Sequence, residues 1–246
     1  MKDIDTDNSP VLRLDAGNDL CAKPFVERPG QLAVASGMMD IYVAMGYDAV
    51  AVGANDLAAG ADLLKKNTKM PWLSANLRDG QGQSLFPASV MLKRGDLRIG
   101  VIGLTGAVPI NQSGLRVDDW RPLLTEAVKD LRKDCHLLVA LSNLSAADNA
   151  EIMNNYPDID LIITGGSTSR GNITPRSGSD GKPWQVQTTS EGKALGVLTL
   201  FSQEGPSLPM NWEIRALTVP LTMAIPEDPV IADMVRHIEE AAGAAQ

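Results

Sequence analysis

Short apolar runs typical of strands alternate with amphipathic stretches along the chain. Residues 49–53 are small or β-branched and uncharged, which predicts a buried strand. Upstream, apolar positions recur at helical spacing over 31–45, and Gly46 stands where helices commonly end. A strand over 11–17 precedes that helix and ends in a glycine turn. The chain therefore opens with the strand, helix and strand of a layered α/β protein.

The alternation continues downstream and changes character after residue 164. Two β runs flank residues 93–96 and predict a hairpin, because Gly95 suits its turn. The last third predicts a β meander followed by a terminal helix that opens at Asp228. The remaining predicted elements are a helix entered at Asn55 or Asp56 and running through Leu64, a strand over 72–77, hairpin strands over 85–92 and 97–104, a helix capped by Asp118 or Asp119 that ends before Cys135, a strand over 136–141, a helix over 146–155, and strands over 161–164, 184–189, 194–201 and 212–219.

These elements predict a single α/β domain over residues 1–246, with mixed sheets packed face to face and helices outside. The length is about one and a half times that of a typical domain of ~150 residues, and no internal repeat divides the chain. The Ser- and Gly-rich stretch 171–181 is the clearest flexible loop, and it lies inside the domain.

Charge and composition narrow the classes of partner. Lys and Arg number 22 against 30 Asp and Glu, a net charge of −8, which argues against nucleic acid as a partner. No apolar run approaches the ~20 residues of a membrane-spanning helix, so we expect no membrane insertion. Cys21 and Cys135 fit no metal-binding pattern, and they fall at opposite edges of the predicted sheet, so we expect no disulfide between them. The only two histidines, His136 and His237, are interpreted as structural.

Four loops that follow predicted strands carry clustered polar residues. Because ligands of α/β folds meet the loops beyond the carboxyl ends of strands, we expect these four loops to lie at one edge of the molecule. The loops are 15–19, 53–56, 141–145 and 165–170.

The residues of these loops resemble a known family. Leu14–Asn18 is similar to a Gly-Asp motif, Met45–Asp56 to the approach to Gly-Asn-His-Glu, and Ile162–Ser169 to the approach to Gly-Gly-His-Ser-His. These are motifs of the calcineurin-like metallophosphoesterases, in their 5′-nucleotidase branch. The resemblance runs from Val11 to about His237 and implies a four-layer α/β/β/α sandwich with mixed sheets. It also implies a periplasmic or extracellular setting.

The metal-ligand positions of that family are changed in this chain. The opening Asp-x-His strand has no good counterpart, because only Asp3-Ile4-Asp5 precedes Asp15, and we expect that first motif to be missing or cut off. We also expect no counterpart of the family's C-terminal nucleotide-recognition domain within the 246 residues. Carried over residue by residue, the bridging Asp falls on Asn18, a ligand Asn on Ala54, the catalytic His on Asn55, the mid-chain His on Asn143, and the last two His on Ser167 and Ser169.

Amides and hydroxyls are weak ligands for the transition metals that carboxylates and imidazoles hold. We therefore expect no metal cofactor, although Asn and Asp oxygens could weakly hold Ca²⁺ or Mg²⁺. Asp15, Asp19 and Asp56 could act as general acids or bases, or simply cap helices. The full set of ligand-binding candidates is Asp15, Asn18, Asp19, Asn55, Asp56, Asn143, Ser167, Thr168, Ser169 and Arg170.

Together these features predict a divergent 5′-nucleotidase-like protein that is catalytically inactive and acts as a binding or assembly module. Its partner would be a protein or a small anionic ligand, for which the 165–170 loop offers backbone N–H groups, hydroxyls and Arg170. One alternative is an active phosphohydrolase of nucleotides or phosphate esters with an unconventional site. A second is an exported redox or partner-binding module that uses Cys21 as a reactive thiol.

Overall fold

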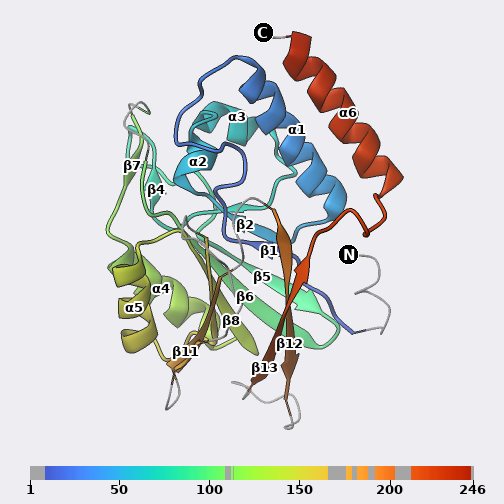
Figure 1. Cartoon of the computed structure of the whole chain (residues 1–246). Helices are drawn as coiled ribbons and strands as arrows, with labels where there is room; N and C mark the ends of the chain where they lie inside the picture. Colours follow the sequence, from blue (N-terminus) through green and yellow to red (C-terminus); the bar gives the residue numbers. More distant parts are fainter. Residues whose placement is uncertain are drawn as a thin grey trace.

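Two β-sheets face each other at the centre of the molecule, and helices cover their outer sides (Figure 1). The computed structural model describes residues 9–108, 112, 114–165, 176–178, 182–187, 192–202 and 212–244. The smaller sheet is parallel, in the order β1-β2-β3, and comprises β1 (Leu14–Asp15), β2 (Ala49–Ala51) and β3 (Trp72–Leu73).

The larger sheet has six strands in the order β10-β11-β9-β8-β6-β5. Its central pairs β6·β8 and β8·β9 are parallel, and its edge pairs β5·β6 and β10·β11 are antiparallel, so the sheet is mixed. The strands are β5 (Ser89–Arg94), β6 (Leu97–Leu104), β8 (Leu137–Ser142), β9 (Leu161–Thr164), β10 (Arg176–Gly178) and β11 (Lys182–Gln187).

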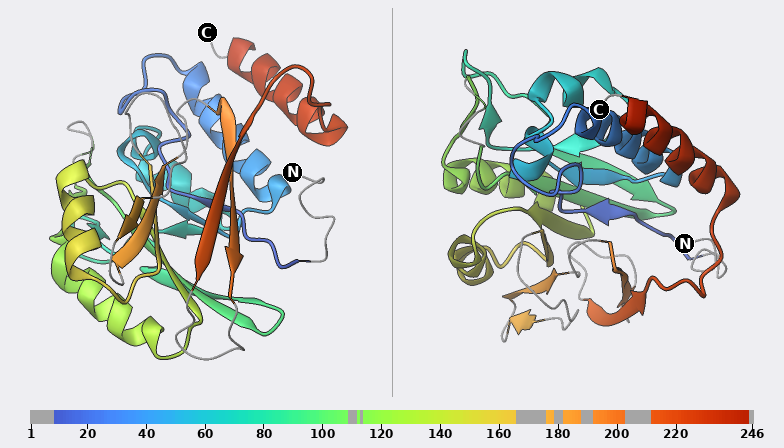
Figure 2. Two further views of the ribbon diagram at one scale, coloured as in Figure 1. Left: turned by 60° about the horizontal axis from the view of Figure 1, so that its bottom comes forward. Right: turned by 45° about the horizontal axis from the view of Figure 1, so that its top comes forward.

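Three apolar clusters separate four layers of structure. One cluster lies between the two sheets, where Ala49, Leu73, Val101 and Val139 are all buried. A second packs the smaller sheet against α1 (Gly30–Met45), α2 (Ala54–Leu57) and α3 (Ala61–Lys66). The third packs the larger sheet against α4 (Trp120–Arg132) and α5 (Ala146–Asn155). The four-layer α/β/β/α architecture expected from the sequence is confirmed, and the two views of Figure 2 show its layers.

Helix ends follow from local sequence chemistry. The Asp119 carboxylate accepts the Arg121 backbone N–H at 3.2 Å and caps α4, and the Ser145 hydroxyl accepts the Asp148 N–H at 3.1 Å and caps α5. Gly46 ends α1 in the left-handed conformation, with φ of 70°. The predicted cap at Asn55 or Asp56 is wrong, because Gly53 occupies the N-cap of α2 and the predicted single helix is divided into α2 and α3.

Two short ribbons flank the main sheets. β4 (Leu77–Arg78) pairs with β7 (Arg116–Val117), so the strand predicted over 72–77 is broken into β3 and β4. β12 (Ala194–Phe201) pairs along its whole length with β13 (Glu213–Pro220). The predicted meander is wrong in one respect, since β11 does not pair with β12 and instead joins β9 in parallel. Residues 176–178, predicted within a flexible loop, form β10; the rest of 171–181 lies outside the described residues.

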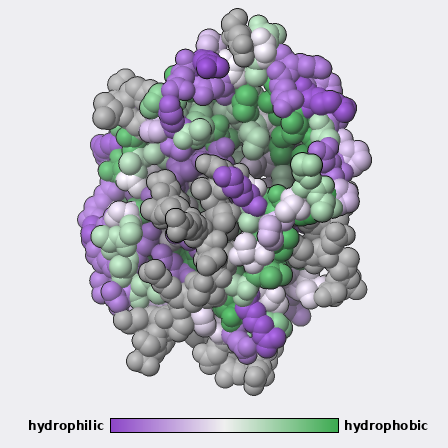
Figure 3. Space-filling model, in the orientation of Figure 1, coloured by the Kyte–Doolittle hydropathy of each residue, from purple (hydrophilic) through white to green (hydrophobic). Residues whose placement is uncertain are grey.

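The C-terminal helix α6 (Pro229–Ala244) lies along α1 on the outside of the sandwich. Glycines make this contact close: a Cβ at Gly37 would lie 2.2 Å from Ile238 Cγ1, and one at Gly30 would lie 2.6 Å from the carbonyl oxygen of Ala242. Figure 3 shows apolar side chains along α1 beside the hydrophilic outer face of α6. None of the described helices is long and apolar enough to cross a membrane.

Candidate functional site

Polar loops from both sheets meet at the carboxyl ends of β1, β2, β8 and β9. The Asn18 side-chain amide donates to Asn143 Oδ1, and the Asn143 amide in turn donates to the carbonyl oxygen of Ala16. A Cβ at Gly165 would lie 2.8 Å from that same carbonyl oxygen, so the loop after β9 reaches the group as well. The loops expected to share one edge do so as far as they are described. Ser167, Thr168, Ser169 and Arg170 lie outside the described residues.

Asn18 is the centre of this network. Its Oδ1 accepts the backbone N–H of Asn55 at 2.9 Å, while its amide nitrogen donates to Asn143. Asn18 has φ of 77°, a left-handed conformation that Asn tolerates better than most residues. Gly53 allows the contact, because a Cβ there would lie 2.2 Å from Asn18 Oδ1. The amide oxygens of both Asn18 and Asn143 therefore already accept hydrogen bonds from the protein.

Asp56 holds the loop after β1 in place. Its side chain is fully buried, and its two oxygens accept backbone N–H groups from Asn18, Asp19 and Leu20 at 2.8–3.1 Å and from Gly53 at 2.8 Å. Burial raises the pKa of Asp56, and the four donated hydrogen bonds oppose that rise. With every donor supplied by the backbone, we assign this carboxyl a structural role.

Asp15 and Asp19 form a second acidic group at the mouth of the same loop. The Tyr42 hydroxyl donates to Asp15 Oδ2 at 3.2 Å, and the Gly17 N–H donates to Asp15 Oδ1 at 2.8 Å. Desolvation, followed by the charges of Asp15 and Asp56, raises the pKa of Asp19 well above its ordinary value, although Asp19 itself is exposed. Among the described residues of the site, the half-buried Asp15 and the exposed Asp19 are carboxyls that a ligand could reach.

Tyr42 contributes its hydroxyl to the site, although the apolar pattern over 31–45 predicts only a buried helix face there. Its ring stacks on Tyr47 with centroids 4.4 Å apart, and burial followed by the charge of Asp15 raises its pKa. The apolar period of α1 correctly placed Tyr42 on the buried face. No local signal marks the hydroxyl, because its acceptor Asp15 lies 27 residues away in sequence.

The donor set at this edge does not fit the metal pair that the family resemblance implies. Two of the positions corresponding to its imidazoles are occupied by the Asn55 and Asn143 amides, and the position of its bridging carboxylate by the Asn18 amide. Two of those three amides already use their oxygens in hydrogen bonds to one another or to the backbone. Among the described residues, no group of three or more His, Cys, Asp or Glu side chains is arranged to hold a metal ion.

Neither cysteine is exposed at the site. Cys21 and Cys135 are buried and unpaired, as expected from their positions at opposite edges of the predicted sheet. Burial, followed by the charge of Asp56, raises the pKa of the Cys21 thiol. A raised pKa disfavours the thiolate that redox chemistry and nucleophilic attack require, so Cys21 behaves as a small core residue.

His136 is structural, as the sequence suggested. Its Nδ1 accepts the Arg98 backbone N–H at 2.9 Å at the start of β8, the end opposite the polar loops, and the residue is buried. His237 is exposed on α6, where its ring contacts the Asp233 carbonyl oxygen at 2.9 Å.

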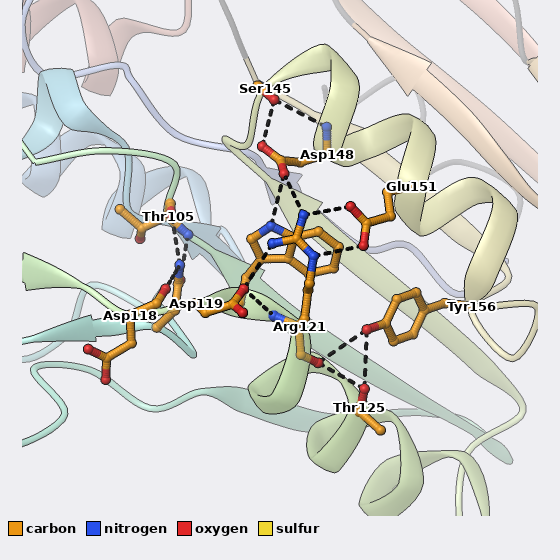
Figure 4. Close-up of polar contacts among 11 residues, drawn as sticks. Thr105, Asp118, Asp119, Arg121, Thr125, Ser145, Asp148, Glu151 and Tyr156 are labelled. Atoms are coloured by element: carbon orange, nitrogen blue, oxygen red, sulfur yellow. Dashed lines mark hydrogen bonds and ion pairs between the residues drawn. The ribbon is translucent and has the colours of Figure 1, made fainter.

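A separate polar network joins α4 to α5 (Figure 4). Arg121 contacts both oxygens of Glu151, at 2.7 and 2.6 Å, and also Asp119 and Asp148. Its guanidinium lies over the Trp120 ring, 4.6 Å from the centroid. Three carboxylates balance the charge of Arg121. We therefore assign Arg121 a structural role, in which its ion pairs hold α4 against α5, and not a role in binding anions.

Comparison with known proteins supports the fold described above. No family profile matches the sequence. Protein UshA of Escherichia coli K12 is 25% identical over an alignment of 209 residues that covers 69% of this chain and 38% of UshA. A 5′-nucleotidase precursor from Thermus thermophilus superposes with a TM-score of 0.77 at 20% identity, covering 96% of this chain and 50% of its own.

The calcineurin-like phosphoesterase YfkN from Bacillus subtilis has a TM-score of 0.70 at 16% identity and covers 94% of this chain. The fold is that of a metallophosphoesterase, and the likeness is to the 5′-nucleotidase branch. This chain spans 38% of the length of UshA and half that of the Thermus protein. The activities of those longer proteins are therefore not assigned to it by likeness.

Proposed function

We propose that this chain is a divergent 5′-nucleotidase-like protein that does not hydrolyse phosphate esters through a metal pair and instead acts as a binding or assembly module. The observation that carries the proposal is the hydrogen-bond network at the strand ends, in which the side-chain amides of Asn18 and Asn143 bond each other and Asn18 also accepts the Asn55 backbone N–H. A metal ion would have to break these hydrogen bonds and would gain only neutral amide oxygens in return.

A protein is the partner that fits this edge better than a small anion. Asp15 lies at its mouth, and the whole chain carries a net charge of −8, so a phosphate or nucleotide meets repulsion there. Arg170, the cation proposed for an anion cradle, lies outside the described residues. By its resemblance to the 5′-nucleotidase branch, we propose a periplasmic or extracellular setting for that partner.

The competing function is phosphate-ester hydrolysis by an unconventional site. The specific observation in its favour is the Asp15–Asp19 carboxyl pair beside the Tyr42 hydroxyl, because a carboxyl with a raised pKa is a candidate general acid. The same assay separates the two functions.

The test is hydrolysis of 5′-AMP and bis(p-nitrophenyl) phosphate, with and without Mn²⁺, by the protein and its Asn18→Ala variant. We expect no turnover that Mn²⁺ stimulates and no difference between the two proteins. Turnover lost in Asn18→Ala or Asp19→Asn, but retained in the control Asn67→Ala, would overturn the proposal. Asn67 is a suitable control, because its amide binds Asp40 away from the strand ends.

A further inference from the structure

A cavity lies at the opposite end of the smaller sheet from the polar loops. It has a volume of about 440 Å³, within the range of small-molecule sites. Asp48 and Pro71, which immediately precede β2 and β3, line it, so it opens at the amino ends of these strands. The cavity and the amide network are therefore separate sites.

The lining of the cavity is aromatic and aliphatic. The rings of Trp72 and Phe86 lie 6.4 Å apart at an angle of 54°, and both side chains are buried. Leu64, Met70 and Leu85 add aliphatic surface around them. Such a lining favours a flat, apolar ring, because ring stacking and burial both stabilise it.

One donor in this lining has no acceptor. The Trp72 indole N–H finds no hydrogen-bond partner among the described residues and is closed off from solvent as well. By contrast, the indoles of Trp120 and Trp212 each donate at 3.2 Å, to Asp148 Oδ1 and to the His136 carbonyl oxygen. An unsatisfied buried donor is costly, so an occupant with a suitable acceptor is favoured once the side chains around it part.

The rim of the cavity offers a positive charge. Lys65 lines it, is exposed, and forms no ion pair within the described part of the chain. Asp48 also lines the cavity, but Arg94 pairs with it and the Arg13 N–H donates to it at 2.9 Å. The available charge at the rim is therefore the Lys65 ammonium, which selects an anionic substituent.

We propose that this cavity binds a small planar heteroaromatic acid, whose ring contacts Trp72 and Phe86, whose ring acceptor takes the Trp72 indole N–H, and whose carboxylate meets Lys65. The aromatic rings, the indole N–H and the Lys65 ammonium are three different chemical groups. A substitution can therefore remove the indole N–H or the ammonium and keep an aromatic ring at position 72.

The test uses two probes of the same shape. Quinoline-6-carboxylate carries a ring nitrogen opposite its carboxylate, and naphthalene-2-carboxylate lacks that acceptor. In ¹H–¹⁵N spectra of the whole chain we expect quinoline-6-carboxylate to shift the Trp72 indole resonance. We expect it to bind about 2- to 10-fold more tightly than naphthalene-2-carboxylate, the range that one neutral hydrogen bond contributes.

Variants separate the acceptor from the charge. Trp72→Phe keeps an aromatic ring and should bind both probes equally, whereas the control Trp212→Phe should keep the preference. Lys65→Gln should weaken both probes, and the adjacent Lys66→Gln, outside the cavity lining, should weaken neither.

Two results would overturn the inference. One is a Trp72 indole signal unmoved by millimolar quinoline-6-carboxylate. The other is equal affinity of the folded wild-type protein for the two probes. Both are measured on the unaltered chain, so they hold even if Trp72→Phe fails to fold.

Discussion

Asp56 shows how one buried carboxylate can organise a site without acting in it. Its carboxylate accepts four backbone N–H groups. Three belong to the loop after β1, 36–38 residues away in sequence, and the fourth is that of Gly53 in the turn before α2. The sequence marked Asp56 as a polar residue after a strand, which allowed a helix cap, an acid or a ligand. The choice among these depends on a long-range contact that no local pattern encodes.

Replacing Asp56 should destabilise the protein strongly. Asp56→Ala leaves four backbone donors without their acceptor, three of them in the loop that carries Asn18, and we expect the free energy of unfolding to fall by about 3–5 kcal/mol. Urea denaturation followed by circular dichroism measures this. Asp62→Ala, an exposed acid on α3, is the matched control and should change little. Similar stabilities for the two variants would contradict the assigned role.

Asp19 makes stability depend on pH. Its native pKa is raised by desolvation and by Asp15 and Asp56, whereas the unfolded value is about 3.9. Between the two values the native state binds more protons, so the contribution of Asp19 to stability is present below about pH 4 and is lost as pH rises toward the native pKa.

Asp19→Asn should therefore be more stable than the wild-type protein, by a margin that grows from pH 5 to pH 8. The amide resembles the protonated acid and removes the repulsion from Asp15 and Asp56. Denaturation midpoints at three pH values measure the margin. A margin that is constant or shrinks as pH rises would show that the native pKa of Asp19 is not raised.

At the scale of elements, local sequence patterns predicted the bounds of several helices and strands, because local interactions determine those bounds. The 146–155 helix, the 161–164 strand and the 194–201 strand have the predicted bounds, because caps, glycines and apolar runs define them. The pairing of the strands was harder to predict from the sequence. β11 joins β9 in parallel across a connection of more than 15 residues, and the β-rich composition of the last third suggested simple antiparallel neighbours. A single segment shows whether it forms a strand, whereas the pairing of two strands depends on both segments together.

The contact between α1 and α6 gives a test at this scale. α6 has no fully buried residue, and it approaches α1 closely only because Gly30 and Gly37 lack side chains. Gly37→Leu should displace α6 and raise hydrogen exchange across 229–244. Ala44→Leu, at an exposed position of the same helix, should leave that exchange unchanged. Equal protection of α6 in both variants would show that the glycine contact does not hold it.

At the scale of the whole molecule, the architecture was predictable from the sequence, whereas the contacts between residues at its edge were not. Alternating apolar runs predicted sheets packed face to face with helices outside, and the family resemblance implied the four-layer order that the apolar clusters confirm. The same alternation predicted which loops converge. It did not predict that Asn18 and Asn143 would bond each other across the two sheets, because that pair is separated by 125 residues. The scaffold thus resembles the 5′-nucleotidase branch, while its edge has different chemistry.

Metal content after loading tests this account most directly. The purified chain would be incubated with excess Mn²⁺ or Zn²⁺, freed of unbound metal by gel filtration, and measured by inductively coupled plasma mass spectrometry. Because the amides of Asn18, Asn55 and Asn143 replace carboxylate and imidazole ligands, we predict far less than one transition-metal ion per chain. Two ions per chain, reduced in Asn18→Ala but not in Asn67→Ala, would contradict the account.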